Sequence, residues 1–179
     1  MITGSRIILR FLEKEDIQWL YRQLQKKQLE LKPVLSIASL SYEQLMAKYL
    51  ENGLKDQSHR FLIVEHNHEP IGIVWAQKDS FWEGYYVGFI NFSKEHEGKG
   101  FFKEALSLFS AYMFASEKVM RLQIAIPGYH RPSIAIAQKN GYKFEGILRK
   151  ALYLKGEYVD LCLYSLLEEE CLNIDKVLN

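Results

Sequence analysis

Two glycines and a lysine, in the run Glu97-Gly98-Lys99-Gly100, give this chain its clearest capacity for chemistry. Glycine lets the backbone turn tightly and leaves the neighbouring N–H groups uncovered by side chains. Residues with helical periodicity follow the run, and the first N–H groups of a helix have no partner within it. Such amides, together with the positive end of the helix dipole, bind anions. The turn therefore predicts a site for a phosphate or a pyrophosphate.

The elements on either side must position this turn. From position 86 to position 92, aromatic and β-branched residues predict a strand. From position 101 to position 115, apolar residues recur at intervals that place them on one face of a helix. Strand, turn and helix together favour an anion site, although a plain strand-to-helix turn remains the alternative because short glycine motifs recur by chance.

Two other phosphate motifs do not fit the turn. A P-loop has a glycine five residues before its Gly-Lys pair and Ser or Thr after it, but Ser93 and Gly100 stand there. A dinucleotide fingerprint has a third glycine at the position that Lys103 occupies. Both interpretations are therefore excluded.

Length and composition predict one folded domain. The chain has 179 residues, enough for one substantial core, and its 48% hydrophobic content is too high for a disordered chain. We expect this domain to span 1–167 and a polar tail to follow at 168–179. The net charge of +1 and the interspersed charges predict no specific nucleic-acid partner. Lys26, Lys27 and Lys32 are expected to lie on a solvated face.

The remaining composition predicts no metal and no membrane segment. Cys162 and Cys171 have no metal-binding or disulfide spacing, and the five histidines are scattered. No apolar signal segment follows Met1, and no run is long enough to cross a membrane. We therefore expect a cytoplasmic protein, either a monomer or a homodimer.

Periodicity and turn residues predict the other elements along the chain. Strands are expected at 5–11, 61–65, 70–78, 121–126, 142–153 and 158–166, and helices at 13–27, 41–53 and 132–140. Ser41 and Gln44 form a capping-box pattern at the second of these helices. The segment 29–40 contains Pro33 and has no clean period, so a loop or a broken helix is expected there. This order of elements predicts a three-layer α/β/α fold with a mixed sheet.

Three segments of the sequence resemble the GNAT N-acetyltransferases. The glycine turn is similar to the acetyl-CoA pyrophosphate loop of that family. The opening SRIILRFLEKEDIQWLY resembles the start of the branch that acetylates ribosomal-protein N-termini and polyamines, and so does HRPSIAIAQKNGYKFEGILRKALYLKGEYVDLCLYSLL. In the latter, the positions that match the family pattern are Ser133, Lys139, Gly141, Tyr142, Glu145, Gly146, Arg149, Asp160, Tyr164 and Ser165.

The resemblance implies a GNAT-like fold with a centrally splayed sheet and transfer of an acetyl group from acetyl-CoA to a primary amine. A protein N-terminus is the first acceptor to consider, and a polyamine, an aminoglycoside or an amino sugar are the others. Pantetheine lies in the splay in this family, which here implies contacts with Phe89, Ile90, Asn91 and Phe92. The implied pyrophosphate contacts are Glu97, Gly98, Lys99, Gly100, Phe101, Phe102 and Lys103. His130 and Ser133 are implied to lie beside the pantetheine arm.

Catalysis requires a neutral amine and a stabilised thiolate. Glu83, His130 and Asp160 are the candidate bases, directly or through a water molecule. Ala137 takes the place of a tyrosine that protonates the departing thiolate in many family members. Ser133 is four residues away on the same helix face, so we expect it to supply the hydrogen bond. The structural alternatives are a helix cap for Ser133, a hairpin contact for Asp160 and an exposed turn for Glu83.

Two observations keep a second function open. The acids Glu95 and Glu97 lie close to the expected phosphate, and the tyrosine is absent at Ala137. Both are compatible with a non-catalytic acyl-CoA-binding regulatory protein of the same fold. If the chain is an enzyme, neither cysteine lies in a motif that would activate it, so we expect direct transfer in a ternary complex.

Overall fold

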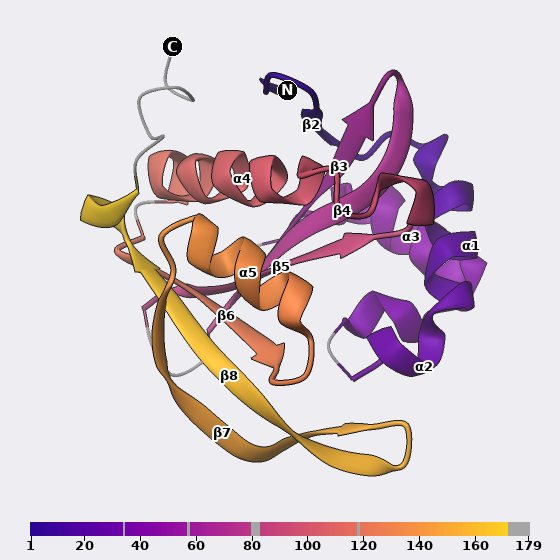
Figure 1. The fold of residues 1–179 in the computed structure, drawn as a ribbon. Coiled ribbons are helices and arrows are strands. Elements are labelled where there is room, and N and C mark those ends of the chain that lie inside the picture. The colour runs from indigo at the N-terminus through magenta and orange to yellow at the C-terminus, as the bar shows by residue number, and fades with distance from the viewer. Residues whose placement is uncertain (34, 57, 80–82, 118, 172–179) are drawn as a thin grey trace.

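An eight-stranded mixed sheet lies between two layers of helices in the computed structural model, which describes residues 1–33, 35–56, 58–79, 83–117 and 119–171 (Figure 1). The strand order is β1-β2-β3-β4-β5-β6-β8-β7. One helical layer contains α1, α2 and α3, and the other contains α4 and α5. The expected three-layer α/β/α architecture is confirmed.

The described elements follow the predicted order. The strands are β1 (Ile2–Thr3), β2 (Ile8–Phe11), β3 (His59–His66), β4 (Glu69–Lys78), β5 (Tyr85–Asn91), β6 (Arg121–Pro127), β7 (Lys143–Leu154) and β8 (Glu157–Leu167). The α-helices are α1 (Asp16–Lys26), α2 (Gln28–Leu31), α3 (Tyr42–Asn52), α4 (Phe101–Glu117) and α5 (Arg131–Lys139). Three 3-10 segments complete them at Ser36–Ser39, Lys94–His96 and Glu168–Glu170.

Two predictions for the N-terminal region need correction. The short strand β1 was not expected, and β2 begins at Ile8 rather than at residue 5. Ser5 and Arg6 leave the strand because their backbone N–H groups donate to the carboxylate of Glu104. Between positions 29 and 40, the structure has the end of α2 and a 3-10 turn, so the broken-helix interpretation is confirmed.

The capping box before α3 is also confirmed. The Ser41 hydroxyl accepts a hydrogen bond from the Gln44 N–H at 3.3 Å, and the Gln44 side chain accepts one from the Ser41 N–H at 2.9 Å. Gly53 closes the helix in the left-handed conformation, with φ +67°. Local sequence therefore fixes both ends of this helix.

The two helical layers cover different parts of the sheet. The layer of α1, α2 and α3 packs on side chains of β3, β4 and β5, among them Ile63, Ile73 and Ile90. The layer of α4 and α5 packs on strands from β2 to β8, and Phe109 of α4 is fully buried there. The centre of the sheet thus lies under helices on both faces.

The sheet splays between β5 and β6. These parallel strands pair only at Tyr85–Leu122 and Tyr86–Gln123, although β5 continues to Asn91 and β6 continues to Pro127. On its other edge, β5 pairs with β4 along its whole length. Figure 1 shows the two strands diverging toward their C-terminal ends. The predicted central splay is confirmed.

The terminal hairpin of β7 and β8 projects from the sheet toward α2 (Figure 1). Lys155 and Gly156 form its turn with positive φ angles of 51° and 92°. The Lys155 ammonium lies 2.7 Å from a carboxylate oxygen of Glu30 in α2. Of the predicted polar tail, residues 168–170 form a 3-10 turn, and residues 172–179 lie outside the described part.

Candidate active site

The splay exposes one backbone edge of β5. The Phe92 N–H donates to the Ile71 carbonyl of β4, at 3.0 Å. Since backbone groups of an antiparallel strand alternate between its two edges, Asn91 and Phe89 direct theirs toward β6. The contact of Lys27 Nζ with the Asn91 carbonyl, at 3.0 Å, agrees with this direction. An extended ligand can therefore add to this edge as a further strand does.

The side chains at positions 89–92 hold this edge in place. Phe89 lies 6.0 Å from Phe102, measured between ring centroids, and packs under α4. Ile90 and Phe92 point to the opposite face and pack under α1. Phe92 also meets the Trp19 ring edge to face. The ligand contacts predicted for this segment would therefore have to come from its backbone groups.

The glycine turn has the geometry that the sequence predicted. Gly98 and Gly100 have φ angles of +72° and +82°, a backbone conformation that residues other than glycine rarely adopt. Helix α4 begins directly after them, and Phe101 and Phe102 bury their rings in the core. The amides of the first turn therefore remain available while the rings anchor it.

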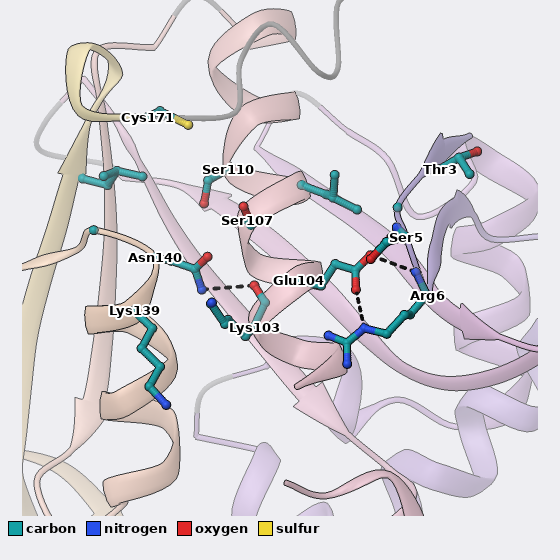
Figure 2. A pocket seen from close by; sticks show the side chains of 14 residues that line it. Thr3, Ser5, Arg6, Lys103, Glu104, Ser107, Ser110, Lys139, Asn140 and Cys171 are labelled. Atoms are coloured by element: carbon teal, nitrogen blue, oxygen red, sulfur yellow. Dashed lines mark hydrogen bonds and ion pairs between the residues drawn. The ribbon is translucent and has the colours of Figure 1, made fainter. Parts of the chain in front are cut away.

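Arg6 and Glu104 lie beside the turn, at the rim of a cavity of about 520 Å³ (Figure 2). The Arg6 Nε donates to Glu104 at 3.1 Å, and its two Nη groups donate to the carbonyls of Lys99 and Gly100. The cavity extends from the N-terminal segment along α4 to the end of α5 and to Cys171. No feature of the sequence indicated these contacts, because about ninety-five positions separate the partners.

Four charged residues close to the turn are exposed, two lysines and two glutamates. Lys99 and Lys103 are free to meet phosphate charge, and Figure 2 shows Lys103 extending from α4 toward Asn140 of α5. The Asn140 side chain donates to the Lys103 carbonyl at 3.1 Å and thereby joins the two helices. Glu95 and Glu97 are also exposed, so water screens their charge from the turn.

His130 and Ser133 lie at the start of α5, at the end of β6 that faces the open splay. His130 is the N-cap residue, and its side chain makes no cap hydrogen bond. Ser133 is half-buried, two residues into the helix, and therefore does not occupy the cap position that the structural alternative assigned to it. Ala137, one turn further, is fully buried.

The other two candidate bases, Asp160 and Glu83, lie at opposite ends of the splay. Asp160 is exposed at the start of β8, and its carboxylate accepts a hydrogen bond from the Lys150 N–H at 2.7 Å. Lys150 has a positive φ of 49° at an irregularity of β7, so Asp160 stabilises the hairpin there. Glu83 is exposed just before β5, at the paired end of the splay. The residues 81 and 82 of its aromatic turn lie outside the described part.

The sequence did not indicate a cluster of charged side chains at the open end of the splay, formed by Lys27, Glu30 and Lys155. Lys27, expected on a solvated face, instead donates to β5, and Glu30 pairs with Lys155. The hydrogen bond from Lys155 lowers the pKa of Glu30, and the charges of Lys27 and His130 lower it further. These side chains border the region through which an acceptor would reach the splay.

Among the described residues, no group of His, Cys, Asp and Glu side chains is arranged to hold a metal ion. Within the same residues, no helix has the length and apolar character needed to cross a membrane.

Comparison with known proteins gives concordant results. The model of the acetyltransferase (GNAT) domain matches residues 6–143. The SPbeta prophage-derived uncharacterized N-acetyltransferase YokL of Bacillus subtilis is 25% identical over 171 residues, which cover 94% of this chain and 93% of that protein. Spermidine N-acetyltransferase from Vibrio cholerae, solved with CoA and spermine, has a TM-score of 0.81 at 20% identity and covers 95% of this chain and 100% of its own. RimL, a ribosomal L7/L12 alpha-N-protein acetyltransferase solved with coenzyme A, has a TM-score of 0.77 at 20% identity over 92% and 95% of the two chains.

Proposed function

Because this chain belongs to the GNAT acetyltransferase family, we propose that it transfers an acetyl group from acetyl-CoA to a primary amine. The observation that carries the proposal is the splay, where β5 and β6 pair at two positions and then separate. The gap leaves the backbone edge of β5 open for pantetheine, and it ends at a glycine turn whose amides suit a pyrophosphate.

The pantetheine arm, the pyrophosphate and the thioester of acetyl-CoA would each meet a different feature of this chain. The backbone groups of Phe89 and Asn91 would hold the pantetheine amides, and the amides from Gly98 to Phe102 would hold the pyrophosphate. Lys99 and Lys103 would offset phosphate charge, while His130 would lie beside the pantetheine arm. A backbone N–H on the open edge of β5 would also polarise the thioester carbonyl toward attack.

The proposed chemistry at the sulfur depends on Ser133. A thiol has a pKa of about 8.5, so its anion leaves with modest assistance. Ser133 lies on the α5 face that also carries Ala137, and its hydroxyl can donate to the departing sulfur from there. For the acceptor, Glu83 or Asp160, acting through water, would take the proton from the ammonium form of the amine.

A protein N-terminus is the first acceptor to test, followed by polyamines, aminoglycosides and amino sugars. The comparisons support the first two classes, since one structural neighbour acts on a ribosomal protein N-terminus and another holds spermine. The acceptor would enter beside Lys27 and the Glu30–Lys155 pair, which border the open end of the splay.

Release of free thiol from acetyl-CoA, measured across a panel of peptides and amines, tests this function. We expect thiol release that depends on one acceptor class. The mass of that acceptor should rise by ~42 Da, as one acetyl group replaces one proton. Binding of acetyl-CoA without thiol release for any acceptor would instead support a non-catalytic acyl-CoA-binding regulatory protein.

The transfer is proposed to be direct, within a ternary complex. Cys162 is half-buried in β8, and Cys171 lies beside the cavity along α4 rather than in the splay. Neither position suits a covalent acetyl carrier. Intersecting lines in a two-substrate kinetic plot are expected, and an acetylated cysteine trapped by mass spectrometry would contradict direct transfer.

A further inference from the structure

We propose that Arg6 is the positioning residue of the CoA-binding turn, holding its carbonyl groups on one side so that its amides face the phosphate. This inference rests on the proposed function, because it concerns the same turn. Arg6 would act on the ligand through the backbone of residues 99–101.

The contacts of Arg6 with the turn are specific. Its Nη1 donates to the Lys99 carbonyl at 2.8 Å, and its Nη2 donates to the Gly100 carbonyl at 3.3 Å. The guanidinium carbon also lies 5.3 Å from the centre of the Phe101 ring. One planar side chain therefore grips two successive peptide groups and the first residue of α4.

Because of peptide geometry, the hydrogen bonds from Arg6 to these carbonyls also orient the N–H groups that follow them. In a trans peptide the carbonyl and the following N–H point in opposite directions. Holding the Lys99 carbonyl toward Arg6 therefore turns the Gly100 N–H away from it. The Gly100 carbonyl accepts from the Arg6 Nη2 and also from the Glu104 N–H of α4, at 3.2 Å, so Arg6 and the helix together direct the Phe101 N–H. These are the amides that a pyrophosphate at the start of α4 would use.

Arg6 is itself held in place by Glu104 and His66. Glu104 accepts hydrogen bonds from Ser5 and from both the backbone N–H and the Nε of Arg6. The His66 ring lies 2.7 Å from the Arg6 carbonyl, measured from Nδ1. Figure 2 shows the Arg6 and Glu104 side chains meeting across the rim of the cavity. The guanidinium is thus fixed before any ligand binds.

The charge of Arg6 also suits its position. Carbonyl oxygens next to a phosphate are unfavourable, and Arg6 engages two of them. Its side chain remains 49% exposed, and so it adds positive charge beside the turn that follows the exposed Glu95 and Glu97 in the chain. Lysine could not replace it, because a single ammonium lacks the planar fork that reaches two carbonyls and a carboxylate.

The test compares two acyl donors, acetyl-CoA and acetyl-pantetheine, which lacks the pyrophosphate. For Arg6→Met we expect the KM for acetyl-CoA to rise about tenfold or more, as for lost hydrogen bonds to a charged group, with kcat within twofold. The kcat/KM for acetyl-pantetheine should stay within twofold. Arg6→Lys should recover little of the loss and serves as the second variant if Arg6→Met does not fold.

Arg60→Met is the matched control, because Arg60 pairs with a glutamate at the other end of α4. It should leave the ratio of the two kcat/KM values unchanged. An equal loss with both donors in the Arg6 variants would mean a structural role alone and would overturn the proposal, as would an unchanged KM for acetyl-CoA. If the wild-type protein binds CoA without turnover, the proposed function fails, and calorimetric CoA affinity of the same variants decides this inference.

Discussion

An arginine–glutamate pair holds each end of helix α4 against the sheet region. The two pairs differ in the contacts that the arginine makes beyond its glutamate. At the C-terminal end, Arg60 of β3 donates to Glu117 through Nε at 2.7 Å and Nη2 at 2.9 Å, and both side chains are largely shielded. At the N-terminal end, the Arg6 guanidinium donates to Glu104 through Nε alone, and both of its Nη groups donate to the glycine turn. The first pair serves the fold, and the second also shapes the candidate site.

Helix electrostatics predicts that the C-terminal pair matters more for stability than the N-terminal pair. A carboxylate near a helix C-terminus is repelled by the negative end of the dipole, whereas one near the N-terminus is attracted. Glu117 is the last residue of α4, and Glu104 lies in its first turn. Arg60 therefore compensates the unfavourable charge of Glu117, whereas the charge of Glu104 interacts favourably with the helix dipole even without Arg6.

Breaking the C-terminal pair should have the largest effect, and only on stability. Arg60→Met leaves the shielded Glu117 with only the Tyr85 hydroxyl, at 3.5 Å, so we expect the free energy of unfolding to fall by about 3 kcal/mol. Denaturant unfolding measures that loss, and calorimetry should show acetyl-CoA affinity within twofold of the wild type. A tenfold loss of affinity would contradict the division between the two ends.

The N-terminus of α5 provides a second helix start at the splay, where catalysis rather than binding is expected. Removing the hydroxyl in Ser133→Ala should lower kcat by about tenfold to a hundredfold, at ~1.4 kcal/mol per decade, because a hydrogen bond to a charged sulfur contributes about 1.5–3 kcal/mol. The melting temperature should hardly change, since Ser133 is not the cap of α5. A lower melting temperature with kcat within twofold would assign Ser133 a structural role.

The glycine turn tests the N-terminal end of α4 directly. A Cβ at Gly100 would lie 3.2 Å from the Arg6 Nη2, in a backbone conformation with φ +82°. Gly100→Val should therefore strain the turn by about 1–2 kcal/mol and displace Arg6, lowering acetyl-CoA affinity at least tenfold. Calorimetry on the folded variant measures this, and unchanged affinity would remove the turn from the site.

Gly98→Ala is the matched variant for that experiment. Gly98 has a similar φ of +72°, but nothing lies within 4 Å of a Cβ placed there. Its effect should therefore be limited to backbone strain of about 1 kcal/mol, a fewfold loss of affinity. A loss equal to that of Gly100→Val would show that displacing Arg6 contributes nothing.

Sequence sufficed where a structural signal is local. The turn, the strand before it and the helix after it are contiguous, and the capping box of Ser41 and Gln44 spans four residues. The splay itself was implied only by resemblance, because no local pattern records where two parallel strands separate.

What sequence could not supply are contacts between distant segments. Arg6 meets residues 99, 100 and 104, Lys27 meets Asn91, and Glu30 meets Lys155, each across at least 60 positions. The first strand was predicted to begin too early for the same reason, since Ser5 leaves it to reach Glu104. In each case a polar side chain binds a group that only the folded sheet brings near.

Lowering the pH should weaken the Arg6–Glu104 pair at the N-terminal end of α4, because it protonates Glu104. This is the smallest of the predicted effects. Burial alone would raise the pKa of Glu104, but the hydrogen bonds from Arg6 and Ser5 outweigh it, and the pKa is lowered. A carboxylate whose pKa is lowered by folding contributes stability above its unfolded pKa of about 4.3, and this contribution is lost as the pH falls below that value. The free energies of unfolding of the wild type and of Glu104→Gln should thus differ by a constant amount from pH 7 to about pH 5 and converge below about pH 4.3. A difference that stays constant down to pH 3 would mean that the Glu104 charge does not hold Arg6 in place.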